Sequence, residues 1–269
     1  MITTRIYLPD KHALTFYHEK ATAEFWDKHW QIDDLRRYLQ AFTFSNDGLF
    51  ITAVKHFLPV GSTILEGGCG RGQLVNALHN QGYRVIGVDF ASVTVAKINQ
   101  VMPELDVRVG DIRNLQLEDT TLDGYISAGV IEHFWGGYAQ ILAEMQRTIK
   151  FGGFLFITFP YMSPLRRFKA RLGCYPRCVS QELDCQQENI YQFAFPLESV
   201  QHDLEQMGFV LYQCQTFGGI KGLKDEISWL KPWLQPIFDG KRGQRYAHFL
   251  DRLFRPFASH VALLVMQKV

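Results

Sequence analysis

The chain has 269 residues, a net charge of +1 and 47% hydrophobic residues. This length suits one large α/β domain or a domain with additions, and the hydrophobic content excludes a disordered chain. The near-zero net charge excludes a global electrostatic attraction to nucleic acid. Residues 1–10 do not show the charged and then apolar pattern of a signal segment, and no apolar run approaches the ~18 residues of a membrane span. The five cysteines are odd in number and scattered along the chain. We therefore expect a cytoplasmic protein with reduced thiols.

The N-terminal segment combines aromatic and charged residues. Residues 11–45 show helical periodicity at Phe25, Trp26 and Trp30, which predicts two or three helices before the core. We therefore divide the chain into an N-terminal helical cap, 1–45, and a second domain, 46–269.

Residues 46–160 alternate between helical and strand-like patterns. A helix is expected to start at Asn46-Asp47-Gly48 and to end before Pro59, and strands and helices then alternate up to Pro160. Such alternation predicts a parallel sheet with helices on both faces. Further along, the pattern predicts a helix over 197–207 and strands over 209–216 and 260–269.

A glycine-rich loop, Gly68-x-Gly70-x-Gly72, follows the first apolar run of this alternation. Glycine lets the backbone turn sharply and approach a ligand where a Cβ would collide. Glu66 precedes the loop, and Asp89 ends the next apolar run. An acidic residue at the end of a second strand can accept hydrogen bonds from ribose hydroxyls. These features predict a site for an adenosine-type cofactor.

The glycine spacing narrows the choice of cofactor. The dinucleotide fingerprint G-x-G-x-x-G needs a third glycine where this chain has Gln73. Glu66 would repel a pyrophosphate but could help to hold a cationic amino-acid tail. We therefore do not expect NAD to bind.

Four segments resemble the motifs of class I S-adenosylmethionine-dependent methyltransferases, in the same order. Residues 64–72 resemble motif I, and 107–112 resemble the third strand with its adenine-contacting Asp. Residues 123–134 resemble the fourth strand and the loop below the reactive methyl, and 150–157 resemble the fifth strand. Gly67 stands where the family usually has an apolar residue, and we expect this departure to loosen the loop.

The resemblance covers about residues 50–160 firmly and 190–269 in outline. It implies an α/β fold of the Rossmann-like class I methyltransferase type: a mostly parallel seven-stranded sheet with helices on both faces, the N-terminal helices and two inserts forming a cap. It also implies S-adenosyl-L-methionine as the cofactor. The residues it assigns to cofactor binding are Glu66, Gly68, Cys69, Gly70, Gly72, Asp89, Phe90, Asp111, Ile112 and Ala128.

Methyl transfer requires alignment of a nucleophile, exclusion of water and, for some acceptors, removal of a proton. His133, just after the fourth strand, lies where the methyl group points in this family, and its ordinary pKa of ~6.5 suits a general base. The alternative is that His133 packs or hydrogen-bonds in the loop and takes no part in the chemistry. Glu132 and Tyr161 are the other catalytic candidates. Glu132-His133-Phe134 also resembles the cyclopropane fatty acid synthases, in which the matching Glu lies near a bound bicarbonate.

Two segments exceed what such a core needs. Residues 161–190 are too long for an ordinary connection and are basic in their first half, and 219–258 combine eight Lys/Arg with many aromatic residues. We interpret both inserts, together with residues 11–45, as the walls and lid of the substrate site. For 219–258 the alternative is a purely structural addition or an oligomer contact. Their composition suits an anionic or lipid-linked acceptor and leaves a peripheral membrane contact open.

The expected activity is transfer of a methyl group to a small-molecule or lipid-linked acceptor. The alternatives are a non-catalytic S-adenosylmethionine-binding module and a protein methyltransferase. Nucleic acid is disfavoured as a substrate, because residues 127–130 read Ser-Ala-Gly-Val in place of the Asn/Asp-Pro-Pro-aromatic motif of adenine methylation. Cys174, Cys178 and Cys185 lack the spacing of a closed zinc site, so no metal is expected. The oligomeric state stays undetermined.

Overall fold

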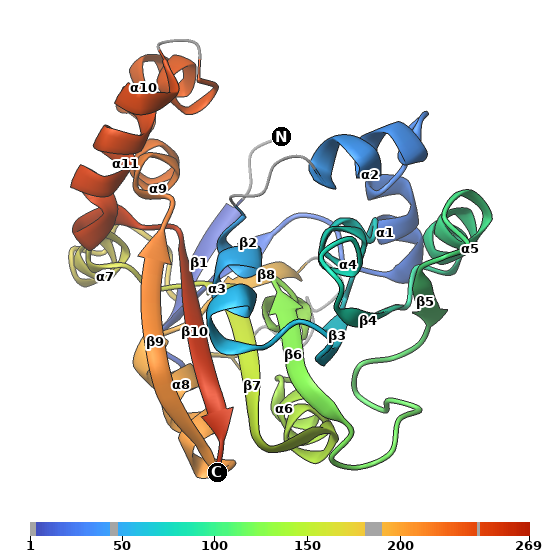
Figure 1. Ribbon diagram of the computed structural model, residues 1–269. Helices are drawn as coiled ribbons and strands as arrows, with labels where there is room; N and C mark the ends of the chain where they lie inside the picture. The colour runs from blue at the N-terminus through green and yellow to red at the C-terminus, as the bar shows by residue number, and fades with distance from the viewer. Residues whose placement is uncertain (1–3, 44–47, 181–189, 241–242) are drawn as a thin grey trace. The chain divides into compact units, whose positions relative to one another are not determined.

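The computed structural model describes residues 4–43, 48–180, 190–240 and 243–269 (Figure 1). The chain divides into two compact units. Unit 1 comprises Met1–Glu19, Thr158–His202 and Cys214–Leu263, and unit 2 comprises Lys20–Ile157, Asp203–Gln213 and Leu264–Val269.

A seven-stranded sheet has the strand order β5-β4-β3-β6-β7-β10-β9. Strand β3 pairs in parallel with β4 and with β6, and β4 pairs in parallel with β5. Strands β9 and β10 run in opposite directions (Figure 1). The predicted, mostly parallel seven-stranded sheet is therefore confirmed. The strands are β3 (Thr63–Gly67), β4 (Arg84–Asp89), β5 (Asp106–Val109), β6 (Leu122–Ala128), β7 (Ile149–Pro160), β9 (Phe209–Phe217) and β10 (Val261–Lys268).

Helices alternate with these strands, as the sequence pattern predicts. Helix α3 begins directly after Gly48 and ends before Pro59, and α8 forms where a helix was expected over 197–207. The helices before and between the strands are α1 (Ala23–His29), α2 (Leu35–Thr43), α3 (Leu49–Phe57), α4 (Gln73–His79), α5 (Ser92–Val101), the 3-10 turn η1 (Ile131–His133), α6 (Ala139–Thr148) and α8 (Leu197–Gln206).

The helices predicted before the core are found as α1 and α2, but the beginning of the segment assigned to the helical cap forms strands. Strands β1 (Thr4–Leu8) and β2 (Ala13–Tyr17) form an antiparallel pair, and β2 also pairs with β8 (Ile190–Ala194). A short apolar run such as Ala13–Phe16 suits a buried strand as well as a helix by periodicity alone. Its partner strand, β8, lies far along the chain, so its pairing was not visible in the local sequence.

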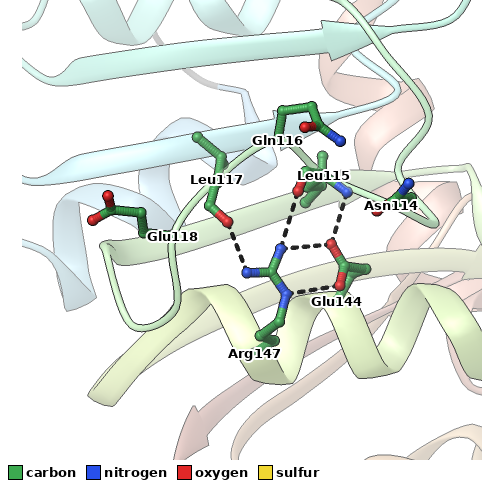
Figure 2. A pocket seen from close by; sticks show the side chains of 7 residues that line it. All are labelled: Asn114, Leu115, Gln116, Leu117, Glu118, Glu144 and Arg147. Atoms are coloured by element: carbon green, nitrogen blue, oxygen red, sulfur yellow. Dashed lines mark hydrogen bonds and ion pairs between the residues drawn. The ribbon is translucent and has the colours of Figure 1, made fainter.

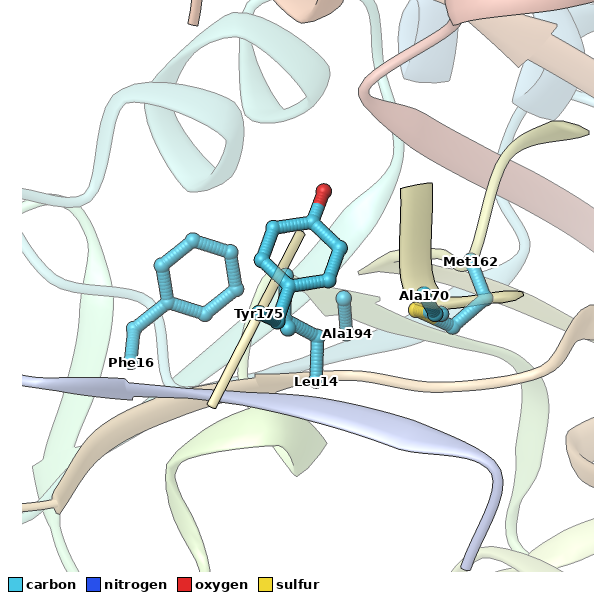
Figure 3. Packing of buried hydrophobic residues seen from close by; sticks show 6 residues of the cluster. All are labelled: Leu14, Phe16, Met162, Ala170, Tyr175 and Ala194. Atoms are coloured by element: carbon cyan, nitrogen blue, oxygen red, sulfur yellow. The ribbon is translucent and has the colours of Figure 1, made fainter. Parts of the chain in front are cut away.

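Unit 1 has a hydrophobic core at its three-stranded sheet. Figure 3 shows Tyr175 and Phe16 among the packed side chains of this core. The other members are Leu14, Met162, Ala170 and Ala194. The remaining helices of this unit come from the two predicted inserts: α7 (Pro164–Arg171), α9 (Gly219–Glu226), the 3-10 turn η3 (Ser228–Leu230), α10 (Lys231–Phe238) and α11 (Gln244–Ala258).

A buried ion cluster also lies inside unit 1. The carboxylate of this cluster is that of Glu226, whose side chain is 1% exposed. Arg166 donates to Glu226 at 2.9 Å, Lys169 at 2.9 Å and Arg5 at 3.1 Å, and the hydroxyl of Tyr175 donates as well. Burial alone would raise the pKa of Glu226, but the surrounding cations outweigh it and hold the pKa at about 2. This cluster joins β1, α7 and α9.

Candidate functional site

The glycine loop connects β3 to α4 inside unit 2. Gly68, Gly70 and Gly72 all have left-handed backbones, with φ of 75°, 51° and 74°. A residue with a Cβ would cost roughly 1–2 kcal/mol at each such position. The N–H groups of Gly68 and Cys69 donate to the carbonyl of Val88 at 2.8 and 3.1 Å. The loop is thus tied to the end of the neighbouring strand, β4.

Gly67 is accommodated by a neighbouring ring. A Cβ at Gly67 would lie 2.3 Å from the hydroxyl oxygen of Tyr125, which is fully buried on β6. The tyrosine therefore takes the volume of the apolar side chain that the family usually has at this position. We expected Gly67 to loosen the loop, and the filled space gives no support to that expectation.

Glu66 is a buried carboxyl group next to the loop. It is 2% exposed, and its Oε2 has no hydrogen-bond partner among the described residues. Burial raises its pKa well above the ordinary value, opposed by a hydrogen bond from the backbone of Val75 and reinforced by the charge of Asp89. A buried carboxyl oxygen without a partner is costly, and a cationic ligand would supply one.

Asp89 ends β4 and holds the glycine loop. Its Oδ2 accepts from the N–H of Gly70 at 2.8 Å, and its Oδ1 accepts from the N–H of Ala91 at 2.9 Å. A carboxylate offers about four lone-pair sites, so these bonds leave acceptor capacity for ribose hydroxyls. Burial raises the pKa of Asp89, and the two backbone hydrogen bonds lower it. Phe90 follows with 40% of its surface exposed.

Asp111, the predicted adenine contact, is already paired. Arg113 binds it with a closest distance of 2.6 Å, and the hydrogen bonds from Arg113 lower the pKa of Asp111. The guanidinium of Arg113 also lies 5.4 Å from the ring centroid of Phe134. Ile112, which lies between Asp111 and Arg113 in the sequence, is buried. A ligand at Asp111 would therefore share its carboxylate with Arg113.

Glu132 lies in the turn that follows β6, just past Ala128 and Gly129. It is 3% exposed, and its Oε2 has no hydrogen-bond partner among the described residues. Burial raises the pKa of Glu132 to about 8, against a smaller lowering by its own backbone. A carboxyl group with this pKa is a stronger base than an ordinary one and can exchange a proton near neutral pH.

His133 meets the aromatic helix α1. The ring of Trp26 contacts His133 edge-on, with centroids 5.0 Å apart and an interplanar angle of 80°. Trp26 also stacks on Trp30 at 5.3 Å. Asp27 fastens the same helix to α5, since its Oδ1 accepts from the N–H and the hydroxyl of Thr94, both at 2.8 Å. Helix α1 therefore covers His133 on one side.

Arg71 connects the end of α1 to the glycine loop, and the sequence analysis did not identify it. Its guanidinium donates to the carbonyls of Trp30 at 3.0 Å and His29 at 3.2 Å. It also lies 5.2 Å from the ring of Trp30 and 5.3 Å from that of Tyr38. Gly70 is close as well, because a Cβ there would lie 3.0 Å from the Trp30 ring. The position of Arg71 between two loop glycines was the only sequence signal for this role.

Tyr161, the third catalytic candidate, belongs to unit 1. It is 6% exposed, and its backbone N–H donates to the carbonyl of His260 at 3.3 Å. Burial raises its pKa, while hydrogen bonds with Thr216 and Ser259 lower it. The role of Tyr161 as a catalytic residue stays a prediction.

A hollow of about 390 Å³ opens beside α6 and is lined by none of the predicted site residues. Figure 2 shows Arg147 on its wall, bonded to Glu144 and to the carbonyls of Leu115 and Leu117. Asp119 accepts from Arg147 as well. All five donors of the guanidinium are thus used within the protein, so we assign the hollow no ligand.

Metal-ligating side chains do not gather in the described part of the chain, where no group of three or more His, Cys, Asp or Glu could hold an ion. Cys174 is exposed there and Cys178 is half-buried, and Cys185 lies outside the described residues. Within the same residues, no helix is long and apolar enough to cross a membrane.

Comparisons with known proteins agree with this geometry. Residues 65–157 match the model of a family described as “Methyltransferase domain”. A probable S-adenosylmethionine-dependent methyltransferase of Mycolicibacterium smegmatis is 35% identical over 100 residues, which are 37% of this chain and 38% of that protein. The phthiotriol/phenolphthiotriol dimycocerosates methyltransferase 1 of Mycobacterium ulcerans is 29% identical over 102 residues, 36% of this chain and 37% of that protein. Each match thus spans little more than a third of the relative.

The whole architecture has counterparts among solved structures. A TehB-like SAM-dependent methyltransferase from Corynebacterium glutamicum superposes with a TM-score of 0.53 at 19% identity, covering 92% of this chain and 98% of that one. At this identity the likeness concerns the fold, which is the Rossmann-like methyltransferase fold.

Proposed function

Because residues 65–157 belong to the methyltransferase domain family, we propose that the chain is a class I S-adenosylmethionine-dependent methyltransferase acting on a small-molecule or lipid-linked acceptor. The observation that carries the proposal is the glycine loop beside a buried carboxyl oxygen of Glu66 that has no hydrogen-bond partner in the described part of the chain. The proposal includes a cytoplasmic location.

The residues of unit 2 fit S-adenosylmethionine on the evidence of their own chemistry. The oxygen of Glu66 that has no partner among the described side chains suits a cationic amino-acid tail, and the remaining lone pairs of Asp89 suit ribose hydroxyls. Side chains at the loop are excluded sterically, since a Cβ at Gly68 would lie 2.6 Å from Val130. When bound, the cofactor supplies a methyl group on a positively charged sulfonium, ready for in-line displacement.

The protein's own contribution is to position the nucleophile, to exclude water and to accept a proton. Trp26 and Trp30 form an apolar wall that limits the access of water on the side of His133. His133 is the proposed general base, and Glu132 is the second candidate because of its raised pKa near 8. Acceptors that lose a proton on methylation need such a base.

The lipid-linked class of acceptor is supported by one of the relatives. The protein of Mycobacterium ulcerans is named for phthiotriol/phenolphthiotriol dimycocerosates. We propose an acceptor of related character, with an apolar body and an anionic or hydroxylated group, and we include contact with a membrane surface in the proposal.

Isothermal titration calorimetry with S-adenosylmethionine, S-adenosylhomocysteine and NAD tests the cofactor. The first two should bind and NAD should not, and tight binding of NAD alone would reject the proposal. A turnover assay across metabolites and lipid extracts, with detection of S-adenosylhomocysteine, then tests the acceptor. Cofactor binding without turnover on any acceptor would favour a non-catalytic binding module.

The role of His133 is tested by the His133→Gln variant from pH 5.5 to 9. Loss of a general base should lower turnover on the order of 10²–10⁴-fold while cofactor affinity stays nearly constant. Near-wild-type rates across this range would remove His133 from the mechanism and leave Glu132 and Tyr161 as the candidates.

A further inference from the structure

Helix α11 carries two apolar stripes on different faces. The inner stripe, formed by Ala247, Leu250, Phe254 and Ala258, packs into a hydrophobic cluster with α7, α9 and α10. The outer stripe repeats at intervals of three or four residues, so it also lies along one face of the helix. Its members are Tyr246, Phe249, Leu253 and Phe257, which are exposed by 50%, 62%, 58% and 46%.

Two glycines of α9 hold α11 in this orientation. A Cβ at Gly222 would lie 1.6 Å from the carbonyl oxygen of Ala258, and a Cβ at Gly219 would lie 2.5 Å from that of Asp251. The two helices therefore pack backbone against backbone. Rotation of α11 would break this contact, so the outer stripe stays on the surface of unit 1.

The neighbouring turn η3 and helix α10 add large exposed aromatic side chains. Trp229 is 72% exposed, Trp233 is 66% exposed and Phe238 is 47% exposed. Leu234 and Ile237, on the other side of α10, are buried in the same cluster that receives α11. We call the exposed side chains of η3, α10 and α11 the aromatic surface of unit 1. Such a concentration of exposed rings is unusual for a surface that meets only water.

The charge on this surface is mainly positive. Lys231, Arg245 and Arg252 are exposed on α10 and α11. Two acidic residues, Asp251 of α11 and Asp239 directly after α10, form hydrogen bonds within the protein. Asp251 accepts from the N–H of Ile220 at 3.1 Å, and Asp239 accepts from the side-chain amide of Gln235 at 2.7 Å.

We propose that the aromatic surface of unit 1 binds the surface of an anionic lipid bilayer. Tryptophan, tyrosine and phenylalanine side chains insert at the level of the head groups, and arginine and lysine beside them pair with lipid phosphates. A second copy of the chain fits less well, because a two-fold contact would place like charges against each other. The inference extends the proposed function, because a lipid-linked acceptor would be reached at a bilayer surface. The biological purpose of the binding rests on the proposed function, whereas the binding itself is argued from the surface residues alone.

Co-sedimentation of the full-length protein with vesicles tests the proposal. The vesicles contain either phosphatidylcholine alone or equal parts of phosphatidylcholine and phosphatidylglycerol. The protein should bind the anionic vesicles at least tenfold more tightly, and added salt should weaken the binding. Equal binding to both kinds of vesicle, or to neither, would overturn the proposal.

The decisive variant carries Phe249→Ser and Leu253→Ser on the outer stripe. It should lose at least tenfold in affinity for anionic vesicles while its thermal unfolding and its S-adenosylmethionine affinity stay as in the wild type. The control is Phe151→Ser, which removes an even more exposed ring (73%) in unit 2 and should leave vesicle binding normal. Retained vesicle binding by the double variant would reject the assignment.

Two further measurements separate this inference from its competitors. Arg245→Glu with Arg252→Glu should abolish the preference for anionic vesicles, and an unchanged preference would contradict it. Sedimentation velocity would detect a dimer that the double variant loses; such a dimer without vesicle binding would assign the surface to a second copy. Because cofactor binding is measured on the same samples, failure of the membrane inference removes the proposed membrane contact but leaves the proposed methyltransferase activity intact.

Discussion

The carboxylate of Asp89 accepts a hydrogen bond from the backbone N–H of Gly70, 19 positions earlier in the chain, at 2.8 Å. This bond joins the end of β4 to the middle of the glycine loop. Asp89 is therefore a positioning residue for the loop as well as the proposed acceptor for ribose hydroxyls. Its removal should affect the site in both ways.

The Asp89→Ala variant should bind S-adenosylmethionine roughly 10- to 150-fold more weakly, which corresponds to about 1.5–3 kcal/mol for hydrogen bonds to a charged group. Asp89→Asn should lose less, because its amide oxygen can still accept from Gly70. Calorimetry on both variants measures the difference. An unchanged dissociation constant in folded Asp89→Ala would reject the role.

Glu132 should make the protein less stable as the pH rises. Its pKa is about 8 in the folded state against an ordinary value of 4.5, so the unfolded chain releases this proton at a lower pH than the folded protein does. The contribution of Glu132 to the free energy of unfolding is therefore fully present below about pH 4.5 and is lost as the pH rises through about 8.

The Glu132→Gln variant should flatten this dependence, because its amide does not titrate. Urea unfolding at intervals between pH 5 and 9 measures the slope. Part of it should remain in the variant, since burial also raises the pKa of Glu66. An identical slope in wild type and variant would show that Glu132 is ionised normally.

The buried carboxylate of Glu226 should stabilise unit 1. Glu226→Gln would leave Arg166, Lys169 and Arg5 without their shared partner, and removal of one member of a buried ion cluster costs roughly 3–5 kcal/mol. The control is Glu198→Gln, which removes an exposed partner of Arg167 and should cost about 0–1 kcal/mol. Equal effects in denaturant unfolding would contradict the prediction.

Acid should reproduce the effect of the Glu226 substitution. The folded pKa of Glu226, about 2, lies below its ordinary value of 4.5. The stabilisation is therefore present above about pH 4.5 and is lost as the pH falls through about 2. Wild type should lose stability over this interval more steeply than Glu226→Gln, as measured by unfolding curves at each pH.

Trp26 should influence the chemical step through the ring of His133. Trp26→Ala removes the edge that contacts His133, and misplacement of a reacting group by about 1 Å can cost on the order of 10²-fold in rate. Trp26→Phe keeps an aromatic edge and should retain most of the activity. Single-turnover rates with an identified acceptor measure the effect, and equal rates in the two variants would exclude a positioning role.

The features that the sequence by itself determined are local ones. The loop Gly68-x-Gly70-x-Gly72 demands left-handed backbones that only glycine adopts cheaply, and all three are found. The alternation of apolar runs with amphipathic helices likewise predicts the parallel sheet, and Asp89 ends its strand as expected. In each case the physical constraint acts between residues that are neighbours along the chain.

Only the tertiary structure decided which distant residues meet. Arg71 lies over the rings of both Trp30 and Tyr38. Arg5 forms an ion pair with Glu226, which is more than two hundred positions away in the chain. Strand β2 finds its second partner at β8 in the same way. Periodicity reports the face that a residue buries but carries no information on what lies opposite that face. These pairings, and the raised pKa of Glu132, arise from packing and burial, which exist only once the chain has folded.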